Sequence, residues 1–326
     1  MKNNVRRLIV ALLIGVALYG AFVLYAGYRE IDASLHAFHW SAFAAALGLA
    51  TSNYLLRFLK WEYYLARLDV RGVEKLDSLL VFLSGFVLTV TPGKVGEVFK
   101  SAVLAQTHGV PAARTAPIIV AERLTDVIGV VLLIVLGSAG FSGGLPWAAA
   151  GTFAVLVGLV LILWDKPLVT LIRWCESRPG RLAALAPKLT EAHASLKIVA
   201  SPQALLWPTL LSVLAWGCEG VALYLILAGF GTNVGLTLSV FFYTTATLAG
   251  AIIPVPGGLG VTEAMIHEQL VRLGGVEQAA ATSSMILVRF ATLWWAVAVG
   301  FFALFLLRIR YPVLRGGAPE PSVENG

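Results

Sequence analysis

The sequence predicts an all-α, polytopic integral membrane protein built from two inverted-topology repeats. The first observation is composition: of 326 residues, 58% are hydrophobic and 13% are charged, and the mean hydropathy is +0.83. The second is that the hydrophobic residues gather in eight long segments with Lys and Arg between them. The third is a pair of similar Pro-Gly motifs, one in each half. This composition does not fit a soluble, collagen-like, disulfide-rich or nucleic-acid-binding protein.

The hydrophobic segments have the lengths of membrane helices. They cover residues 8–26, 40–59, 76–91, 116–141, 146–164, 205–230, 236–255 and 283–307. The first is longer than a signal-peptide core and ends without a small-x-small cleavage site, so we expect it to be retained as a crossing.

The placement of basic residues predicts the topology. Lys and Arg cluster at the N-terminus, in the loop at 60–75 that begins with Lys60, in the middle loop at 166–197 and at the C-terminus. Because basic segments stay in the cytoplasm, we expect both termini on the cytoplasmic side of the cell inner membrane.

Two of the segments are predicted to form re-entrant hairpins. The limb at 79–91 is short for a span at about 1.5 Å per residue, and a full crossing there would place the basic middle loop outside. The same reasoning, with the C-terminus kept inside, makes 236–273 a hairpin that enters from the outer face. The sequence therefore predicts about six crossings and two re-entrant hairpins, and it leaves eight full crossings open.

The two hairpins carry similar motifs. Pro92-Gly-Lys-Val-Gly96 is echoed by Pro256-Gly-Gly-Leu-Gly260; each is followed by a carboxylate and, further on, by a helix with an intramembrane arginine. Such breaks leave backbone donors for a ligand, and a helix N-terminus favours an anion such as phosphate. Inverted repeats are typical of transporters, although short Pro-Gly motifs also recur by chance in membrane helices. The residues expected to shape the hairpins are Pro92, Gly93, Gly96, Pro254, Pro256, Gly257, Gly258 and Gly260.

We expect a single membrane domain over residues 1–315. Its first half covers about 1–164, a cytoplasmic linker about 165–204 and the second half about 205–315, with a disordered tail at 316–326. Prolines at 179 and 187 divide the linker into short basic segments, which are expected either to lie as helices on the inner membrane surface or to act only as a tether.

Ionisable side chains at membrane depth form the candidate site. An ionised group in mid-bilayer costs on the order of 2.5–3.5 kcal/mol, so such residues are usually functional. We expect the arginines to pair with carboxylates across the two halves and to leave one cation for a lipid phosphate; closed salt bridges with a structural role are the alternative. The candidates for substrate binding or gating are Lys94, Glu97, Glu122, Arg123, Asp126, Glu219, Glu263 and Arg289.

No cofactor and no metal are expected. Glu263 and His267 lie four residues apart on a predicted helix, but no H-E-x-x-H motif or third clustered ligand accompanies them. No G-x-S-x-G, P-loop or dinucleotide-binding motif stands out, so the sequence indicates no enzyme active site.

At these positions the sequence resembles a known family. Pro92-Gly-Lys-Val-Gly-Glu97, Glu122-Arg123-x-x-Asp126 and Pro254-Val-Pro-Gly-Gly-Leu-Gly-Val-Thr-Glu263 are similar to the hallmark motifs of the lysylphosphatidylglycerol synthetase transmembrane (flippase-like) family. The resemblance covers nearly the whole chain. It implies an inner-membrane protein related to the part of the MprF-type proteins that moves aminoacylated phosphatidylglycerol between leaflets. We expect no lysyl transfer, because the chain leaves no room for the soluble synthase domain.

Together these features predict a lipid flippase for an anionic or phosphate-containing lipid. Its partners would be membrane lipids, either phospholipid or polyprenyl-linked, and a homo-oligomer stays open. Two alternatives remain: a membrane-embedded transferase or phosphatase acting on a lipid-linked substrate, and a non-transporting scaffold that binds a partner through the middle loop.

Overall fold

The computed structural model describes residues 28–90, 96–138, 144, 146, 148–153, 156–157, 164–178, 185–253 and 255–315. Every regular element within these residues is helical, so the predicted all-α class is confirmed. The first predicted hydrophobic segment, most of the fifth and the tail at 316–326 lie outside the described residues.

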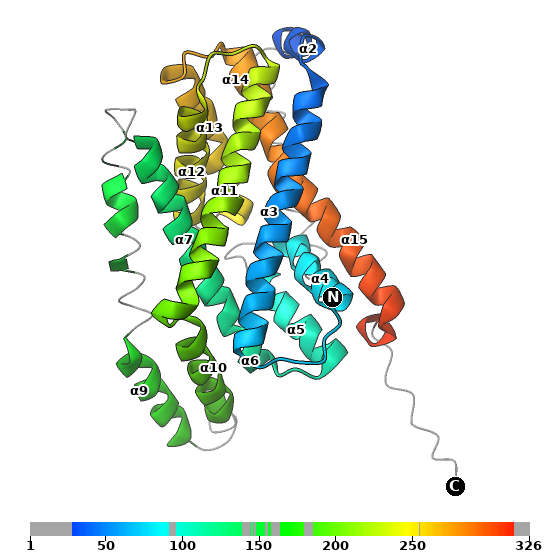
Figure 1. Cartoon of the computed structure of the whole chain (residues 1–326), viewed down its shortest axis with the longest axis vertical. Coiled ribbons are helices and arrows are strands. Elements are labelled where there is room, and N and C mark those ends of the chain that lie inside the picture. The colour runs from blue at the N-terminus through cyan, green and yellow to red at the C-terminus, as the bar shows by residue number, and fades with distance from the viewer. Residues whose placement is uncertain are drawn as a thin grey trace.

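Two long helices of equal length form the centre of the bundle. α3 (Trp40–Arg67) and α11 (Pro202–Gly229) have 28 residues each and make the most extensive helix–helix contact in the described part of the chain. Figure 1 shows that they run in opposite directions. Both exceed the length of about 20 residues that a membrane-spanning helix needs.

The other described elements of the first half are helices on either side of residues 91–95. In order these are α4 (Lys75–Ser84), the 3-10 helix η1 (Gly85–Leu88), α5 (Gly96–His108), α6 (Ala112–Thr115) and α7 (Pro117–Ser138). Proline begins α7, where its missing N–H costs no hydrogen bond. In Figure 1, α4, α5 and α6 lie in the lower half of the molecule.

The described part of the second half is also entirely helical. It contains α12 (Leu236–Ile252), η4 (Pro256–Gly258), α13 (Val261–Arg272), α14 (Gln278–Arg289), the π-helix η5 (Phe290–Trp294), α15 (Trp295–Arg310) and η6 (Pro312–Arg315). α14, η5 and α15 form one continuous helix of 33 residues. In Figure 1, α12 and α13 lie in the upper half, opposite to α4 and α5.

Short helices occupy both ends of the bundle. α2 (Tyr28–His36) lies at the upper end, and α9 (Asp165–Glu176) and α10 (Ala186–Val199) lie at the lower end (Figure 1). The middle loop therefore contains the short helices that its prolines predict.

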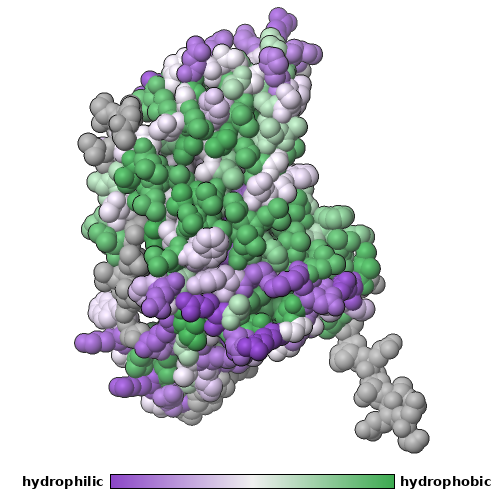
Figure 2. All heavy atoms as spheres, in the orientation of Figure 1, coloured by the Kyte–Doolittle hydropathy of each residue, from purple (hydrophilic) through white to green (hydrophobic). Residues whose placement is uncertain are grey.

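The outer surface of the bundle is that of a membrane protein. Among the described helices, three are long and apolar enough to cross a membrane: α3, α11 and the continuous helix Gln278–Arg310. Large hydrophobic side chains point outward along the bundle, with Leu206 75% and Phe302 64% exposed. Figure 2 shows hydrophobic residues over the middle of the visible face, and hydrophilic residues at its upper end and in a band across its lower part. Such extensive apolar surface is stable in lipid and not in water.

The chain just before residues 91–95 packs against the break of the second half, around Gly257 and Leu259. Val90, the last described residue before the first break, packs with Leu259 of the second break and with Leu293 and Val297. The backbone of Gly257 approaches so closely that an added Cβ would lie 3.4 Å from Cα of Val90. Gly257 has φ +62°, a conformation that favours glycine.

A polar cluster joins α4 to the C-terminal end of α15. Asp77 on α4 accepts a hydrogen bond from the hydroxyl of Tyr311 at 2.5 Å and pairs with Nε of Arg310 at 2.7 Å. Burial, together with this hydrogen bond, raises the pKa of Tyr311, so its hydroxyl stays protonated as a donor.

Close packing of α11 against α12 gives a direct test of the bundle. A Cβ on Gly220 would lie 2.9 Å from Cα of Val240, whereas a Cβ on Gly217 would meet nothing within 4 Å. We expect Gly220→Ala to lower the free energy of unfolding by about 1–3 kcal/mol through overpacking. Gly217→Ala should be neutral or should raise it by up to about 1 kcal/mol, the helix propensity gain. Denaturation of both variants in detergent measures the difference; equal stabilities would contradict the packing.

Candidate functional site

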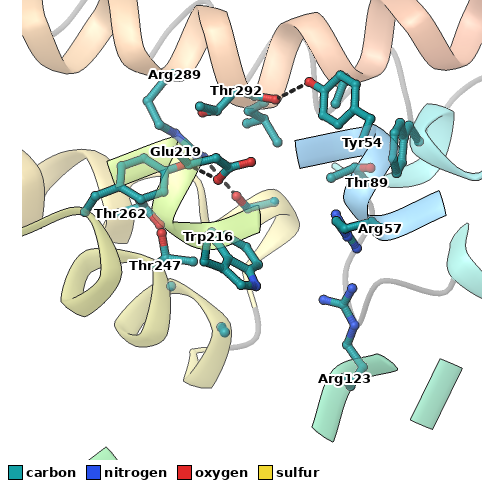
Figure 3. A pocket seen from close by; sticks show the side chains of 18 residues that line it. Tyr54, Arg57, Thr89, Arg123, Trp216, Glu219, Thr247, Thr262, Arg289 and Thr292 are labelled. Atoms are coloured by element: carbon teal, nitrogen blue, oxygen red, sulfur yellow. Dashed lines mark hydrogen bonds between the residues drawn. The ribbon is translucent and has the colours of Figure 1, made fainter. Parts of the chain in front are cut away.

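A cavity of about 100 Å³ lies beside Thr89, at the end of the first described segment, and Gly257 and Gly258 of the second break. Three arginines and one carboxylate line it: Arg57 on α3, Arg123 on α7, Arg289 on α14 and Glu219 on α11. Figure 3 shows that Arg57 and Arg123 point toward one another on one side, with Glu219 and Arg289 on the other. Charged groups are costly at membrane depth and usually functional there, so this cavity is the candidate site.

Asp126 on α7 holds three cations in place. Its Oδ1 accepts a hydrogen bond from Nζ of Lys60 at 2.6 Å and from the hydroxyl of Ser212 at 2.9 Å. Its Oδ2 lies 3.1 Å from Nη2 of Arg123 and 3.8 Å from Nη2 of Arg57. One carboxylate is thus shared by three positive charges, and the two arginines among them reach the cavity.

Glu122 forms a closed ion pair behind the cavity wall. Its Oε2 lies 2.5 Å from Nζ of Lys100, and both side chains are at most 4% exposed. The ammonium of Lys100 also lies 4.5 Å from the ring centre of Trp61 and 5.3 Å from that of Phe82. This aromatic contact adds cation–π attraction to the ion pair.

Arg289 links α14 to the second break. Its Nε lies 2.6 Å from Oε1 of Glu263, and its Nη2 donates to the carbonyl oxygen of Gly257 at 3.0 Å. The other carboxylate oxygen of Glu263 accepts a hydrogen bond from the backbone N–H of Gly260 at 2.7 Å, at the start of α13. Gly257, Gly258 and Gly260 have φ values of +62°, +70° and +87°. Arg289 and Glu263 therefore hold a backbone turn that only glycine adopts readily.

Glu219 is held by an uncharged partner. Its Oε2 accepts a hydrogen bond from the hydroxyl of Tyr243 at 2.6 Å. Trp216, one turn earlier on α11, also lines the cavity, and its buried indole N–H has no hydrogen-bond partner within the described residues. On the opposite helix, the hydroxyl of Tyr54 donates to the backbone oxygen of Thr292 in η5 at 3.1 Å. A π-helical stretch is often found at functional sites.

The predicted site residues fall into three groups. Arg123, Glu219 and Arg289 line the cavity, and Glu122, Asp126 and Glu263 bind cations around it. Gly96 and Glu97 lie in the first turn of α5, and Pro256 begins η4. Four predicted residues lie outside the described residues: Pro92, Gly93 and Lys94 before α5, and Pro254 before η4.

Two expectations about the charges are wrong. Lys60 does not lie in a cytoplasmic loop: it is inside α3 and 1% exposed, because Asp126 and Ser212 satisfy its ammonium. Among the contacts shown for the described residues, the short arginine–carboxylate pairs also stay within one half. Arg289 pairs with Glu263 in the second half, and Arg123 pairs with Asp126 on the same helix in the first half. Within the first half, the shortest ion pair to Asp126 comes from Lys60 on α3, at 2.6 Å.

The sequence reasoning missed Arg57, Trp216 and Tyr54. Arg57 lies inside the second hydrophobic segment. A cation within an apolar segment is costly, and this signal could have identified it. The two aromatic residues gave no such signal, because aromatic side chains are common in apolar helices.

No group of three or more His, Cys, Asp or Glu side chains within the described residues is arranged to hold a metal ion. The site's donors are arginine, indole and hydroxyl groups, which suit an anion and not a cation.

The fold and the cavity define an α-helical, multi-pass membrane protein with an arginine-lined site inside its bundle. The family model described as the lysylphosphatidylglycerol synthase TM region matches residues 9–300, so the chain belongs to this family and the predicted resemblance is confirmed. A UPF0104 membrane protein of Methanothermobacter thermautotrophicus is 22% identical over 318 residues, covering 88% of this chain and 90% of that protein. A UPF0104 membrane protein of Pyrococcus horikoshii is 24% identical over 276 residues, covering 76% of this chain and 81% of that protein. The family places the protein in a lipid-related membrane role.

Proposed function

We propose that this protein is a lipid translocase that moves an anionic or phosphate-containing lipid between the leaflets of the inner membrane. The headgroup crosses through the arginine-lined cavity while the hydrocarbon chains stay in the bilayer. The observation that carries the proposal is the position of Arg57, Arg123 and Arg289 around one cavity beside the second break. Guanidinium groups bind phosphate strongly and in a defined geometry.

An inverted repeat would explain how such a site opens to either side. Asn53 is the fourteenth residue of α3 and Ala215 the fourteenth of α11, and the amide of Asn53 donates to the carbonyl oxygen of Ala215 at 2.8 Å. If a two-fold axis passes between two related helices, equivalent residues of the two helices contact each other where the axis passes.

The cavity lies around the same axis. Tyr54 and Trp216 directly follow Asn53 and Ala215, so they occupy equivalent positions of α3 and α11, and both line the cavity. Arg57 and Glu219 are likewise equivalent, and both line it. Equivalent residues on opposite walls support a transporter in which the two halves alternate around a fixed site.

In this proposal the chain makes about six crossings and two re-entrant hairpins, with both termini in the cytoplasm. The breaks at 91–95 and 253–260 are the tips of the hairpins, and Lys94 and Glu97 lie near the inner one. The linker helices α9 and α10 lie at the inner membrane surface.

Thiol labelling tests this topology. In a variant without the native Cys175 and Cys218, single cysteines replace Arg71 and Gln106, which flank the first hairpin, or Asn233 and Glu277, which flank the second. We expect an impermeant reagent to label the first two only from the cytoplasmic side and the last two only from the outer side. If either flanking pair divides between the two sides, the hairpin is a full crossing.

Reconstitution tests the function itself. In proteoliposomes containing a lipid with a labelled headgroup, the protein should speed the movement of a phosphate-bearing lipid between leaflets. A neutral lipid with the same chains should move at the protein-free rate. Equal rates with and without protein for every phosphate-bearing lipid would overturn the proposal.

A further inference from the structure

One tryptophan at the cavity carries a hydrogen-bond donor that the described protein groups do not satisfy. Trp216 on α11 lines the cavity and is 8% exposed, and its indole N–H has no hydrogen-bond partner among the described residues. The nitrogen atom itself is covered by protein. A buried donor without a partner destabilises a protein, so each such donor needs an explanation. A bound group that accepts the hydrogen bond supplies one.

Aromatic donors elsewhere in the bundle have partners. The indole N–H of Trp61, a fully buried residue of α3, donates to the hydroxyl of Ser78 at 3.1 Å. Tyr54 occupies the position of α3 that is equivalent to Trp216, and its hydroxyl donates to the backbone oxygen of Thr292 at 3.1 Å. Buried tryptophan and tyrosine side chains usually find such a partner. Trp216 therefore differs both from a tryptophan of the same bundle and from its own counterpart.

The groups across the cavity cannot accept this hydrogen bond. Figure 3 shows Trp216 on the wall opposite Arg57 and Arg123, with its indole nitrogen on the side toward them. Guanidinium and indole groups have donors and no acceptor, so the two walls cannot satisfy each other. Glu219, one turn along α11, accepts its hydrogen bond from Tyr243 at 2.6 Å. A group that binds to donors on both walls has to bring acceptor oxygens of its own, as a phosphate does.

We infer that Trp216 donates its indole N–H to a phosphate oxygen of the lipid headgroup and is thereby a specificity-determining residue of the site. This deepens the proposed function and rests on it. Because the nitrogen is covered by protein, the contact requires a movement of the cavity wall, and alternating access requires such movements as well. A headgroup without an acceptor oxygen leaves the donor buried and unpaired, so the indole discriminates against it.

An isosteric replacement tests the contact. In Trp216→benzothienylalanine, a sulfur atom takes the place of the ring N–H while the shape of the ring is kept. We expect detergent-solubilised protein with this change to bind dodecyl phosphate about 10- to 100-fold more weakly in calorimetry, the loss of one hydrogen bond to a charged group. The same replacement at Trp207, on the same helix and 50% exposed, should leave the affinity unchanged. Equal affinity of the wild type and the Trp216 variant would overturn the inference.

Stability without dodecyl phosphate separates this role from a structural one. The replacement at Trp216 breaks no hydrogen bond of the described residues, so the unfolding temperature in detergent should stay the same or rise. The same replacement at Trp61 removes the hydrogen bond to Ser78 and should lower the unfolding temperature. A fall for the Trp216 variant as large as that for the Trp61 variant would mean that the N–H serves the fold, and it would overturn the inference.

Nuclear magnetic resonance observes the donor directly. The chain has nine tryptophans, so protein labelled at the indole nitrogens gives up to nine signals, and the one lost in Trp216→benzothienylalanine belongs to Trp216. We expect dodecyl phosphate to move the proton signal of Trp216 downfield, and further than any other indole signal, because a hydrogen bond to an anionic oxygen deshields the proton. A Trp216 signal that stays in place while dodecyl phosphate binds would also overturn the inference.

The proposed function fails by a different result. If vesicles show translocation of a phosphate-bearing lipid and the Trp216 variant translocates it at the wild-type rate and binds dodecyl phosphate normally, the translocase stands and this inference falls. If the Trp216 signal moves and the variant binds dodecyl phosphate weakly, but the wild type moves no lipid between leaflets, the contact stands and the translocase falls.

Discussion

Arg123→Gln is expected to slow lipid translocation about 10- to 100-fold while leaving the protein folded. A hydrogen bond to a charged group contributes about 1.5–3 kcal/mol, and each 1.4 kcal/mol corresponds to a factor of ten. Arg123 is 27% exposed, and its exposed part faces the cavity. Its removal also leaves Asp126 with the nearer partner Lys60 at 2.6 Å, so the carboxylate remains paired. Initial translocation rates in proteoliposomes, with unfolding temperatures in detergent, measure the two effects.

A second arginine separates a role in transport from a role in folding. Arg57→Gln removes a cation 3.8 Å from Asp126 and should slow translocation to a similar extent, although the residue lies on a different helix. Arg272→Gln removes an arginine whose side chain is 77% exposed in an ion pair with Glu268, and should have the wild-type rate. If both cavity variants translocate lipid as fast as Arg272→Gln, the arginines do not bind the headgroup.

The helices that carry few charges could be predicted well from the sequence. The segment predicted at 205–230 is the helix Pro202–Gly229, and the one predicted from 236 is Leu236–Ile252. The second segment was ended at residue 59, but α3 continues to Arg67. Lys60 and Glu62 ended the apolar run in the sequence, whereas in the bundle Lys60 is neutralised by α7. The hydropathy of one helix carries no information about the charges on the helix that packs against it.

The site shows the same division between local and tertiary information. Arg123, Glu219 and Arg289 could be selected because a charge at membrane depth is costly wherever it lies. Their partners could not, since Lys60 and Asp126 are 66 residues apart and meet only because α3 packs against α7. The π-helix at 290–294 could not be predicted either, because no residue in it is a helix breaker.

Glu122→Gln is expected to destabilise the fold strongly, by about 3–5 kcal/mol, because it leaves a buried ammonium without its counter-ion. Glu122 is 3% exposed and Lys100 is 4% exposed, so water cannot replace the lost carboxylate. The contacts of Lys100 with Trp61 and Phe82 reduce this loss of stability but do not cancel it, because an aromatic face carries no net charge. The midpoint of denaturant unfolding in detergent gives the change in free energy.

The double variant Glu122→Met/Lys100→Met decides whether the pair itself stabilises the protein. Removing both charges removes both desolvation costs, so we expect the double variant to regain most of the stability that Glu122→Gln loses. The coupling energy of the cycle, with Lys100→Met as the other single variant, should be well above the roughly 0.5 kcal/mol typical of independent sites. A double variant less stable than Glu122→Gln would mean that each residue has a separate partner. The different expectations for Glu122 and Arg123 follow from their positions. Glu122 lies in a closed ion pair, so its loss should lower the stability of the bundle. Arg123 lies on the cavity wall, so its loss should weaken binding of the lipid headgroup.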